Sequence, residues 1–401
     1  MAGRELHDDT ETDAAFRALQ RRDHRAPLWP APQHHPRQPA YSARPRRDGQ
    51  PARKIRCWIS GNAARIPLVD RRHLCGQLWS QARPAAGALQ DPAIPSCSVV
   101  RRVGLLRHPG SRTLRTLGLP YTGGFTARIS KIDPHGVRTT VADHLPSSQT
   151  SPAIGSLVSG VADVAFIGDT LYALKGGAGC SHGLTNTANG VVIVNPDGSW
   201  KEIANLSLFQ KLHPVAHPEP DDFEPDGTWY SMVSVGDAFY AIEPNHGELD
   251  KIDKSGKITR LVDISASQGH IVPTAMTELF GGIFLISNLN TFPIAPGSSS
   301  LFVATKTGGF VKLISGFTAV LGLAARNGKI YVLEMSNAVN GPAPHTGDIV
   351  SVDLSGHKET VASGLDFPTG MTFGRDGNLY VSNKGFGFGP GEGEVLKITL
   401  H

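Results

Sequence analysis

A unit made of an apolar run, a tight turn, a second apolar run with an aromatic residue, and a polar residue recurs in the second part of the chain. Its fullest copy runs from Phe367 to Asn383, where the turn Asp376-Gly377 separates the two runs. The aromatic position recurs at Tyr172, Tyr240, Phe284, Tyr331 and Tyr380. Their separations of 68, 44, 47 and 49 residues fit a repeat of about 40 to 50 residues with one long insertion, the period of a propeller blade.

A second half-unit alternates with the first. In residues 125–142, β-branched and apolar residues alternate on both sides of a Pro-His-Gly turn, which predicts a pair of strands. The same pattern returns in residues 191–203, 248–262, 301–313 and 348–361. The two half-units together predict a four-stranded antiparallel blade.

Counting these units gives the architecture. A half-blade at about 121–145 is followed by four whole blades at about 158–206, 229–266, 272–316 and 318–363, and by a three-strand unit at 367–400. We therefore predict an all-β, six-bladed propeller whose first blade is incomplete. The strands that are not seen are the first two of blade 1 and the fourth of the last blade.

Charge divides the chain in two. Residues 1–120 hold 21 basic and nine acidic side chains, a net +12, which leaves 18 basic and 26 acidic side chains, a net −8, for residues 121–401. The first part is rich in Arg and Pro, has one Lys and lacks any sustained period. We predict a propeller domain at 121–401 and a disordered or frameshifted region at 1–120, since such composition is typical of GC-rich coding sequence read out of frame.

Targeting signals are few. Met1 to Pro30 is charged throughout and lacks the apolar core of a signal peptide, and no segment is long enough to span a bilayer. A basic arm for nucleic acid would need interleaved stacking aromatics, which are sparse, so we predict no nucleic-acid partner.

In the repeats Cys180 stands alone. It is either half of a disulfide whose partner was lost with the N-terminal blade, or an unpaired surface thiol.

Loop lengths predict where binding occurs. The turns within strand pairs are short, whereas the loops at 175–190, 211–229, 287–293 and 334–347 are long and should share the opposite face of the propeller. The insertion 211–229 has apolar anchors and four prolines, and we expect it to pack across the channel mouth as a lid. The glycine-rich run Gly385 to Gly393 lies between two strands, so we interpret it as a wide loop and not a phosphate loop.

Polar residues follow each aromatic position and mark candidate ligands. Lys175, Glu243, Ser287, Glu334 and Asn383 come three residues after the repeat aromatics and are expected to ring the channel mouth, unless the strands merely end in polar residues. The predicted ligand-binding residues are Lys175, His182, Asp221, Asp222, Glu224, Asn245, His246, His270 and Asn383.

A divalent cation is the alternative use of these loops. Glu243, Glu334, Asn288 and Asn337 carry the oxygen ligands that Ca²⁺ prefers, and Glu243 and Glu334 would then have to approach one another. Their spacing does not demand a metal, and the characteristic Zn and EF-hand spacings do not occur, so no cofactor is predicted otherwise. No Gly-x-Ser-x-Gly elbow occurs, and no catalytic residue is assigned.

Residues 121–401 resemble the ScyD/ScyE family of six-bladed, TolB-like propellers, which are related in architecture to NHL-repeat and SMP-30-type propellers. The resemblance rests on Tyr121-Thr-Gly-Gly-Phe-Thr, Gly160-Val-Ala-Asp-Val-Ala-Phe, the loop Gly179-Cys-Ser-His-Gly183 and the terminal Phe367-to-Asn383 unit. It implies a bacterial protein exported to the periplasm or outside the cell, although the region before residue 121 departs from the family pattern.

Two functions follow as hypotheses. The first is a non-catalytic, monomeric propeller that binds a small molecule, a glycan or a protein on its long-loop face. The alternative is a divalent-metal-dependent hydrolase or lactonase of SMP-30 type, in which the Glu and Asn residues hold a cation that polarises an ester carbonyl or activates water.

Overall fold

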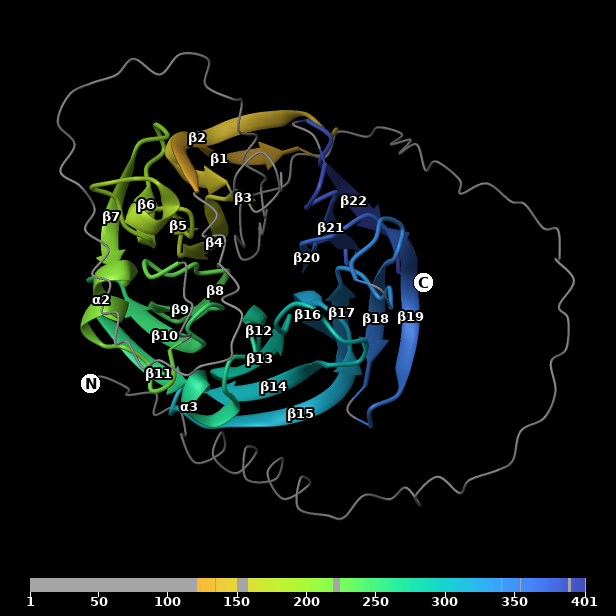
Figure 1. Ribbon diagram of the computed structural model, residues 1–401. Helices are drawn as coiled ribbons and strands as arrows, with labels where there is room; N and C mark the ends of the chain where they lie inside the picture. The colour runs from red at the N-terminus through yellow and green to blue at the C-terminus, as the bar shows by residue number, and fades with distance from the viewer. Residues whose placement is uncertain are drawn as a thin grey trace, which may run out of the picture.

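The computed structural model describes residues 121–133, 135–149, 158–218, 224–339, 341–353, 355–388 and 391–400. Our predictions for residues 1–120 lie outside these ranges. Within them, six antiparallel sheets are arranged as blades in a ring around a common axis (Figure 1). The blades, in chain order, are β1–β3 (Thr122–Ile132, Arg138–Gln149, Val158–Ser159), β4–β7 (Val161–Ile167, Thr170–Lys175, Gly190–Val194, Trp200–Asn205), β8–β11 (Ser231–Val235, Ala238–Glu243, Glu248–Asp253, Ile258–Asp263), β12–β15 (Pro273–Phe280, Ile283–Asn288, Ser299–Thr305, Phe310–Phe317), β16–β19 (Val320–Arg326, Lys329–Glu334, Gly347–Val352, Lys358–Leu365) and β20–β22 (Gly370–Phe373, Leu379–Asn383, Glu394–Ile398).

The predicted fold is confirmed. Blades 2 to 5 are four-stranded meanders, and among the described residues blades 1 and 6 have three strands each. The third strand of blade 1, β3, was not predicted. It is a two-residue strand that pairs with the end of β2 at Ser148 and Gln149.

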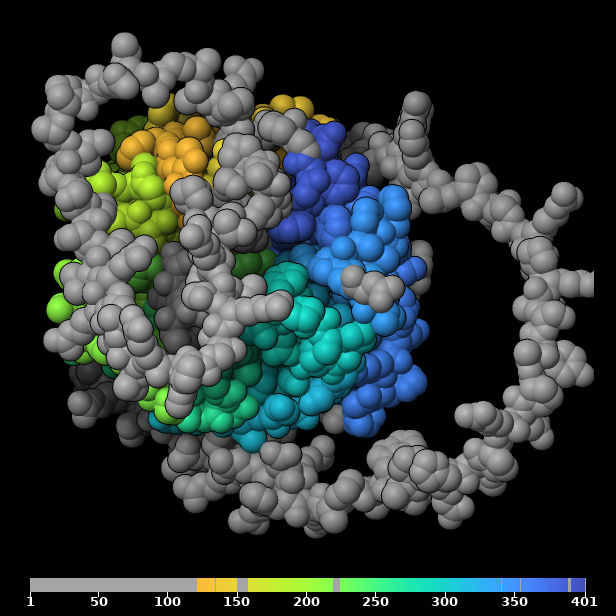
Figure 2. Space-filling model, viewed as in Figure 1, coloured from red at the N-terminus to blue at the C-terminus, as the bar shows by residue number. Residues whose placement is uncertain are grey.

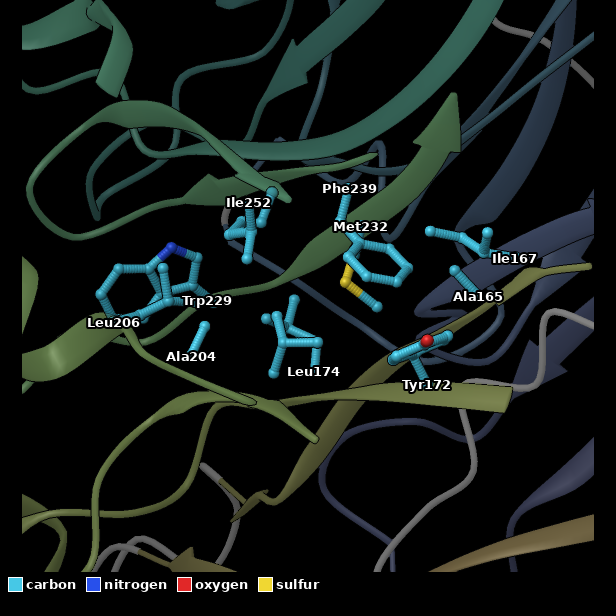
Figure 3. Packing of buried hydrophobic residues seen from close by; sticks show 12 residues of the cluster. Ala165, Ile167, Tyr172, Leu174, Ala204, Leu206, Trp229, Met232, Phe239 and Ile252 are labelled. Carbon is cyan, nitrogen blue, oxygen red and sulfur yellow. The ribbon is translucent and has the colours of Figure 1, made fainter. Parts of the chain in front are cut away.

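The repeat aromatics pack between neighbouring blades. The ring centroid of Tyr172 lies 4.7 Å from that of Phe239 in the next blade, and Tyr240 lies 4.5 Å from Phe284. Figure 3 shows the first of these interfaces, with Leu174 and Tyr172 of β5 facing Met232 of β8 and Phe239. Burying each large side chain contributes roughly 2–3 kcal/mol. The recurring aromatic position therefore exists because it is the main apolar contact between blades.

Turn glycines set the spacing of the first four blades. Gly198, Gly256 and Gly308 occupy the same position in the turn between the third and fourth strands, each with positive φ. A Cβ at Gly198 would lie 2.9 Å from the carbonyl oxygen of Val141, and one at Gly308 would lie 2.9 Å from that of Leu261. At Gly256 it would collide with the carbonyl oxygen of Ile203. Each turn thus rests on the outer strand of the blade before it, at a distance that only glycine allows.

Two short α-helices in the described residues were not predicted. They are α2 (Leu206–Leu212) and α3 (Ile264–Gln268), which follow the outer strands β7 and β11. The side chains of Asn205 and Asp263 accept hydrogen bonds from the backbone N–H of Leu208 and Ala266, at 2.9 Å and 3.0 Å, and so cap the two helices. Within the described ranges, no helix has both the length and the apolar character needed to cross a membrane.

Candidate binding site on the long-loop face

The predicted ring of polar residues is engaged inside its own blades. Glu243 Oε1 accepts a hydrogen bond from the backbone N–H of Thr228 at 2.8 Å, and Asn383 Oδ1 accepts one from Asp366 N at 2.9 Å. Glu334 Oε1 accepts from Thr318 N in the same way. Each side chain thereby ties the end of a second strand to the segment that enters the same blade. Such segments have no strand partner, so this is how their backbone N–H groups are satisfied.

Three other candidates also make internal bonds. The Lys175 ammonium, which is buried, lies 2.7 Å from the carboxylate of Glu202 and stacks over the Trp200 ring at 5.4 Å. Asn288 donates to the carbonyl of Ile271 at 3.0 Å, and Asn337 donates to the carboxylate of Asp348. The side-chain oxygen of Asn288, which was predicted to meet a metal, accepts a hydrogen bond from Ser300 N at 2.7 Å.

The loop after β9 gathers two more candidates around Glu243. The backbone N–H of Asn245 donates to Glu243 Oε1 at 3.1 Å, and His246 Nδ1 lies 3.3 Å from Glu243 Oε2. Burial acts to raise the pKa of Glu243, but the hydrogen bonds and charge of His246 outweigh it and lower that pKa. His270 is half-buried after α3, and Asp221 and Asp222 lie outside the described residues.

The metal candidates are divided between blades. Glu243 makes its bonds in blade 3 and Glu334 in blade 5. Among the described residues, no group of three or more His, Cys, Asp or Glu side chains is arranged to hold a metal ion. Ligation of a cation by these residues stays a prediction.

The insertion follows the surface of the propeller in two described pieces. In the first, Ala216 N donates to Asp263 at 2.7 Å and His217 N to Ser265 Oγ at 3.1 Å, which holds this piece against the outer strand of blade 3 and α3 and not over the channel. In the second, residues 224–230 return to the loop face. The expectation of a lid is therefore wrong for residues 213–217.

The returning piece joins a polar cluster, defined here as Tyr121, Ser148, His182, Glu224 and Asp226. Tyr121 donates to Glu224 Oε1 at 2.5 Å, and its ring lies 5.0 Å from the ring of His182. His182 is fully buried in the short helix η1 (Cys180–His182), with Nδ1 2.8 Å from Ser148 Oγ and Nε2 3.1 Å from the carbonyl of Gly227. Burial lowers the pKa of this histidine.

Asp226 completes the polar cluster. Its Oδ2 accepts from both the backbone N–H and the hydroxyl of Ser181, each at 2.7 Å. The structure thus brings together His182 and Glu224, two predicted site residues, through Tyr121, which the sequence analysis did not select. Cys180 beside them is disulfide-bonded, so its interpretation as an unpaired thiol is wrong.

Two buried acids in β10 were also missed. Burial raises the pKa of Glu248 to about 7, with the Glu243 charge adding to the effect and Arg260 opposing it. Burial and the neighbouring Glu248 raise the pKa of Asp250 well above its ordinary value. Arg260 pairs with Glu248, and Trp229 Nε1 donates to Asp250 at 3.3 Å. Their signal in the sequence was two acids of one strand, two residues apart, on either side of the apolar Leu249.

A second region of the loop face is apolar. The aromatic mouth, as we call it, gathers loops of blades 4, 5 and 6 with the residue before β8, and consists of Tyr230, Leu289, Ile294, Ala319, Leu321, Met335, Phe367, Phe386 and Phe388. Tyr230, Leu289, Phe386 and Phe388 are half-buried. Beside them Phe292 is 64% exposed and Val339 75% exposed. These blades form a continuous teal-to-blue surface (Figure 2).

Tyr230 connects opposite sides of the ring. It precedes β8 in blade 3, and its hydroxyl donates to the carbonyl of Thr369, which precedes β20 in blade 6, at 2.8 Å (Figure 1). The side chain therefore reaches across the channel. The sequence had located the loops of the aromatic mouth, but their aromatic residues, Phe292, Phe386 and Phe388, were not selected. Their signal was the occurrence of large apolar rings in turn-rich loops, where strand packing does not require them.

Comparison with known proteins gives distant likenesses only. No protein-family model matches the chain, and no curated protein matches it. Among solved structures, the chain is similar to one in a nidogen/laminin complex (11% identity, 66% of this chain and 84% of that chain covered, TM-score 0.43). It is also similar to a putative gluconolactonase (11% identity, 57% of this chain and 74% of that chain covered, TM-score 0.36). A third similar structure is virginiamycin B lyase from Staphylococcus aureus (16% identity, 61% of this chain and 69% of that chain covered, TM-score 0.36). At these values the likenesses carry no information about ligand or activity.

Proposed function

We propose that the protein is a non-catalytic, ligand-binding propeller of the ScyD/ScyE type, and that its ligand binds at the aromatic mouth. The observation that supports this most is the aromatic mouth itself, where half-buried side chains from three blades, Tyr230, Leu289, Phe386 and Phe388, remain partly accessible. Apolar surface left in contact with solvent at the loops of a rigid scaffold is characteristic of binding sites. Export to the periplasm or the cell exterior is part of the same proposal and rests on the family resemblance.

The polar residues support binding over catalysis. Lys175, Glu243, Glu334 and Asn383 already satisfy buried groups of their own blades. A metal-dependent hydrolase would need several of these oxygens to converge on one ion. No observation on the described residues favours that alternative.

The uncharged fluorescent dye N-phenyl-1-naphthylamine tests the proposal on the full chain. We expect its fluorescence to rise on binding to the wild type, and the affinity to fall about tenfold in Phe388→Ala, since one ring of the site is removed. Phe280→Ala is the matched control, because Phe280 is 62% exposed but is the last residue of β12, next to the short turn to β13 on the opposite face. Absence of dye binding, or equal losses in the two variants, would contradict the proposal.

A further inference from the structure

We infer that the aromatic mouth takes a neutral sugar ring, as found in an uncharged oligosaccharide, with one ring face against Phe386 and Phe388. This inference rests on the proposed function and names the chemical class of its ligand. It also gives a role to the glycine-rich run after β21, which the sequence analysis treated as a wide loop.

The arrangement of the phenylalanines provides the apolar part of the site. Phe386 and Phe388 both lean on Phe367, with centroid distances of 5.7 Å and 6.2 Å and interplanar angles of 68° and 62°. Phe367 is buried and supports the two half-buried rings. A pyranose presents a face of C–H groups, whose weakly positive hydrogens are attracted to the negative face of an aromatic ring.

Gly387 leaves the backbone between these rings open, whereas Gly385 is buried against Thr369 and donates its N–H to the Phe367 carbonyl. Gly385 and Gly387 alternate with Phe386 and Phe388. Gly387 has φ of +76°, and nothing lies within 4 Å of the point where its Cβ would be. A ligand can therefore approach the main-chain N–H and C=O groups closely while its face rests on the rings. That combination suits a molecule with apolar faces and a polar rim.

Two hydroxyls around the mouth provide the polar part. The side-chain oxygens of Thr369 and Ser298 are buried and have no hydrogen-bond partner among the described residues. Thr369 supplies the carbonyl that Tyr230 binds, and Ser298 belongs to the loop that contains Ile294. A buried hydroxyl without a partner costs roughly 1–3 kcal/mol, so a ligand hydroxyl placed there would recover that cost. A purely apolar ligand would leave both oxygens unsatisfied.

The charges near the mouth are paired, which favours a neutral ligand. The Lys384 ammonium lies 3.3 Å from the Glu394 carboxylate, and His345 Nδ1 lies 2.9 Å from Asp366. An anionic or cationic ligand would have to compete with these internal partners. A neutral sugar would not.

A competition experiment on the full chain tests the inference. Neutral hexasaccharides of glucose, xylose, mannose and N-acetylglucosamine are titrated against bound N-phenyl-1-naphthylamine, and affinities are confirmed by calorimetry. We expect at least one sugar to displace the dye. Its affinity should fall about tenfold in Phe388→Ala and about fivefold in Thr369→Val, which replaces the hydroxyl with a methyl group of similar size. Phe280→Ala should match the wild type, and Phe388→Tyr should restore binding.

The outcomes separate this inference from the proposed function. If the dye binds in a Phe388-dependent manner and no sugar displaces it, the assignment of a sugar as the ligand is wrong, but the location of the binding site at the aromatic mouth is retained. If a sugar binds but Phe280→Ala weakens it as much as Phe388→Ala does, the site is wrongly located. If the dye itself does not bind, the proposed function fails first. Circular dichroism of each variant confirms that it is folded.

Discussion

The polar cluster and the aromatic mouth share the long-loop face but differ in what their side chains do. In the polar cluster, His182 is fully buried, with Ser148 Oγ and the Gly227 carbonyl near its two ring nitrogens, and Asp226 accepts two bonds from Ser181. In the aromatic mouth, Phe386 and Phe388 remain half-buried in their loops. Polar residue types marked places where this fold needs internal hydrogen bonds. The surface left for a partner is apolar.

Removal of His182 should have the largest effect on stability. His182→Ala deletes a buried ring and removes the hydrogen-bond partner of Ser148 Oγ and one of the two partners of the Gly227 carbonyl, so we expect a loss of about 3 kcal/mol in the free energy of unfolding. Urea denaturation measures it, with His135→Ala, in an exposed turn, as the control. A loss below about 1 kcal/mol would mean that the polar cluster is not a structural centre.

Asp226 offers a sharper test because an exposed aspartate elsewhere in the chain, Asp197, makes the same pair of hydrogen bonds to a serine. Asp197 Oδ1 accepts from the N–H and the hydroxyl of Ser199, at 2.9 Å and 2.7 Å, as Asp226 does from Ser181. Because Asp226 is partly buried and Asp197 is exposed, we expect Asp226→Asn to cost about 2 kcal/mol and Asp197→Asn to cost much less. Equal costs for the two variants in urea would show that burial does not distinguish the polar cluster.

Acid should weaken the polar cluster. Because burial lowers the pKa of His182 below the ordinary 6.5, the unfolded chain takes up a proton at pH values where the folded protein does not. The neutral His182 side chain therefore contributes fully to stability above pH 6.5, and this contribution is lost as pH falls below 6.5. The loss amounts to about 1.4 kcal/mol for each unit by which the pKa of His182 differs between the folded and unfolded states. Glu248 acts in the opposite direction, because its pKa is raised to about 7. The measurement is therefore the difference between wild type and His182→Gln in unfolding free energy from pH 7.5 to 5.5, and a constant difference would refute the expectation.

Tyr230 belongs to the aromatic mouth but makes a bond of the kind found in the polar cluster. Tyr230→Phe keeps the ring and removes the hydrogen bond to Thr369, so we expect a loss of about 1 kcal/mol, or about 2–4 °C in Tm. Dye binding should stay within about twofold of the wild type. A large loss of dye binding without a change in Tm would show that the hydroxyl serves the ligand and not the fold.

The fold was predictable because its contacts are local and periodic. The repeat aromatics and turn glycines recur at fixed spacing, and the predicted blade 229–266 corresponds to β8–β11 at 231–263. The helices α2 and α3 were missed because their caps, Asn205 and Asp263, follow strands and begin segments too short to show a helical period.

The site was less predictable because its contacts are not local. Glu243, Glu334 and Asn383 bind backbone N–H groups 15, 16 and 17 residues earlier, in segments whose path depends on the curvature of the ring. The bond between Tyr230 and Thr369 joins residues 139 positions apart. Sequence patterns located the loops, but which side chains face inward depends on how the blades meet.

The turn glycines also have a consequence for how the protein is made. The turn at Gly198 rests on Val141, that at Gly256 on Ile203, and that at Gly308 on Leu261, so each turn touches a blade that was synthesised before it. Domains form from the N-terminal side as the chain leaves the ribosome. For blades 2 to 4, the surface that receives each new turn has therefore already emerged when the turn is translated, and these blades can be added one by one during translation.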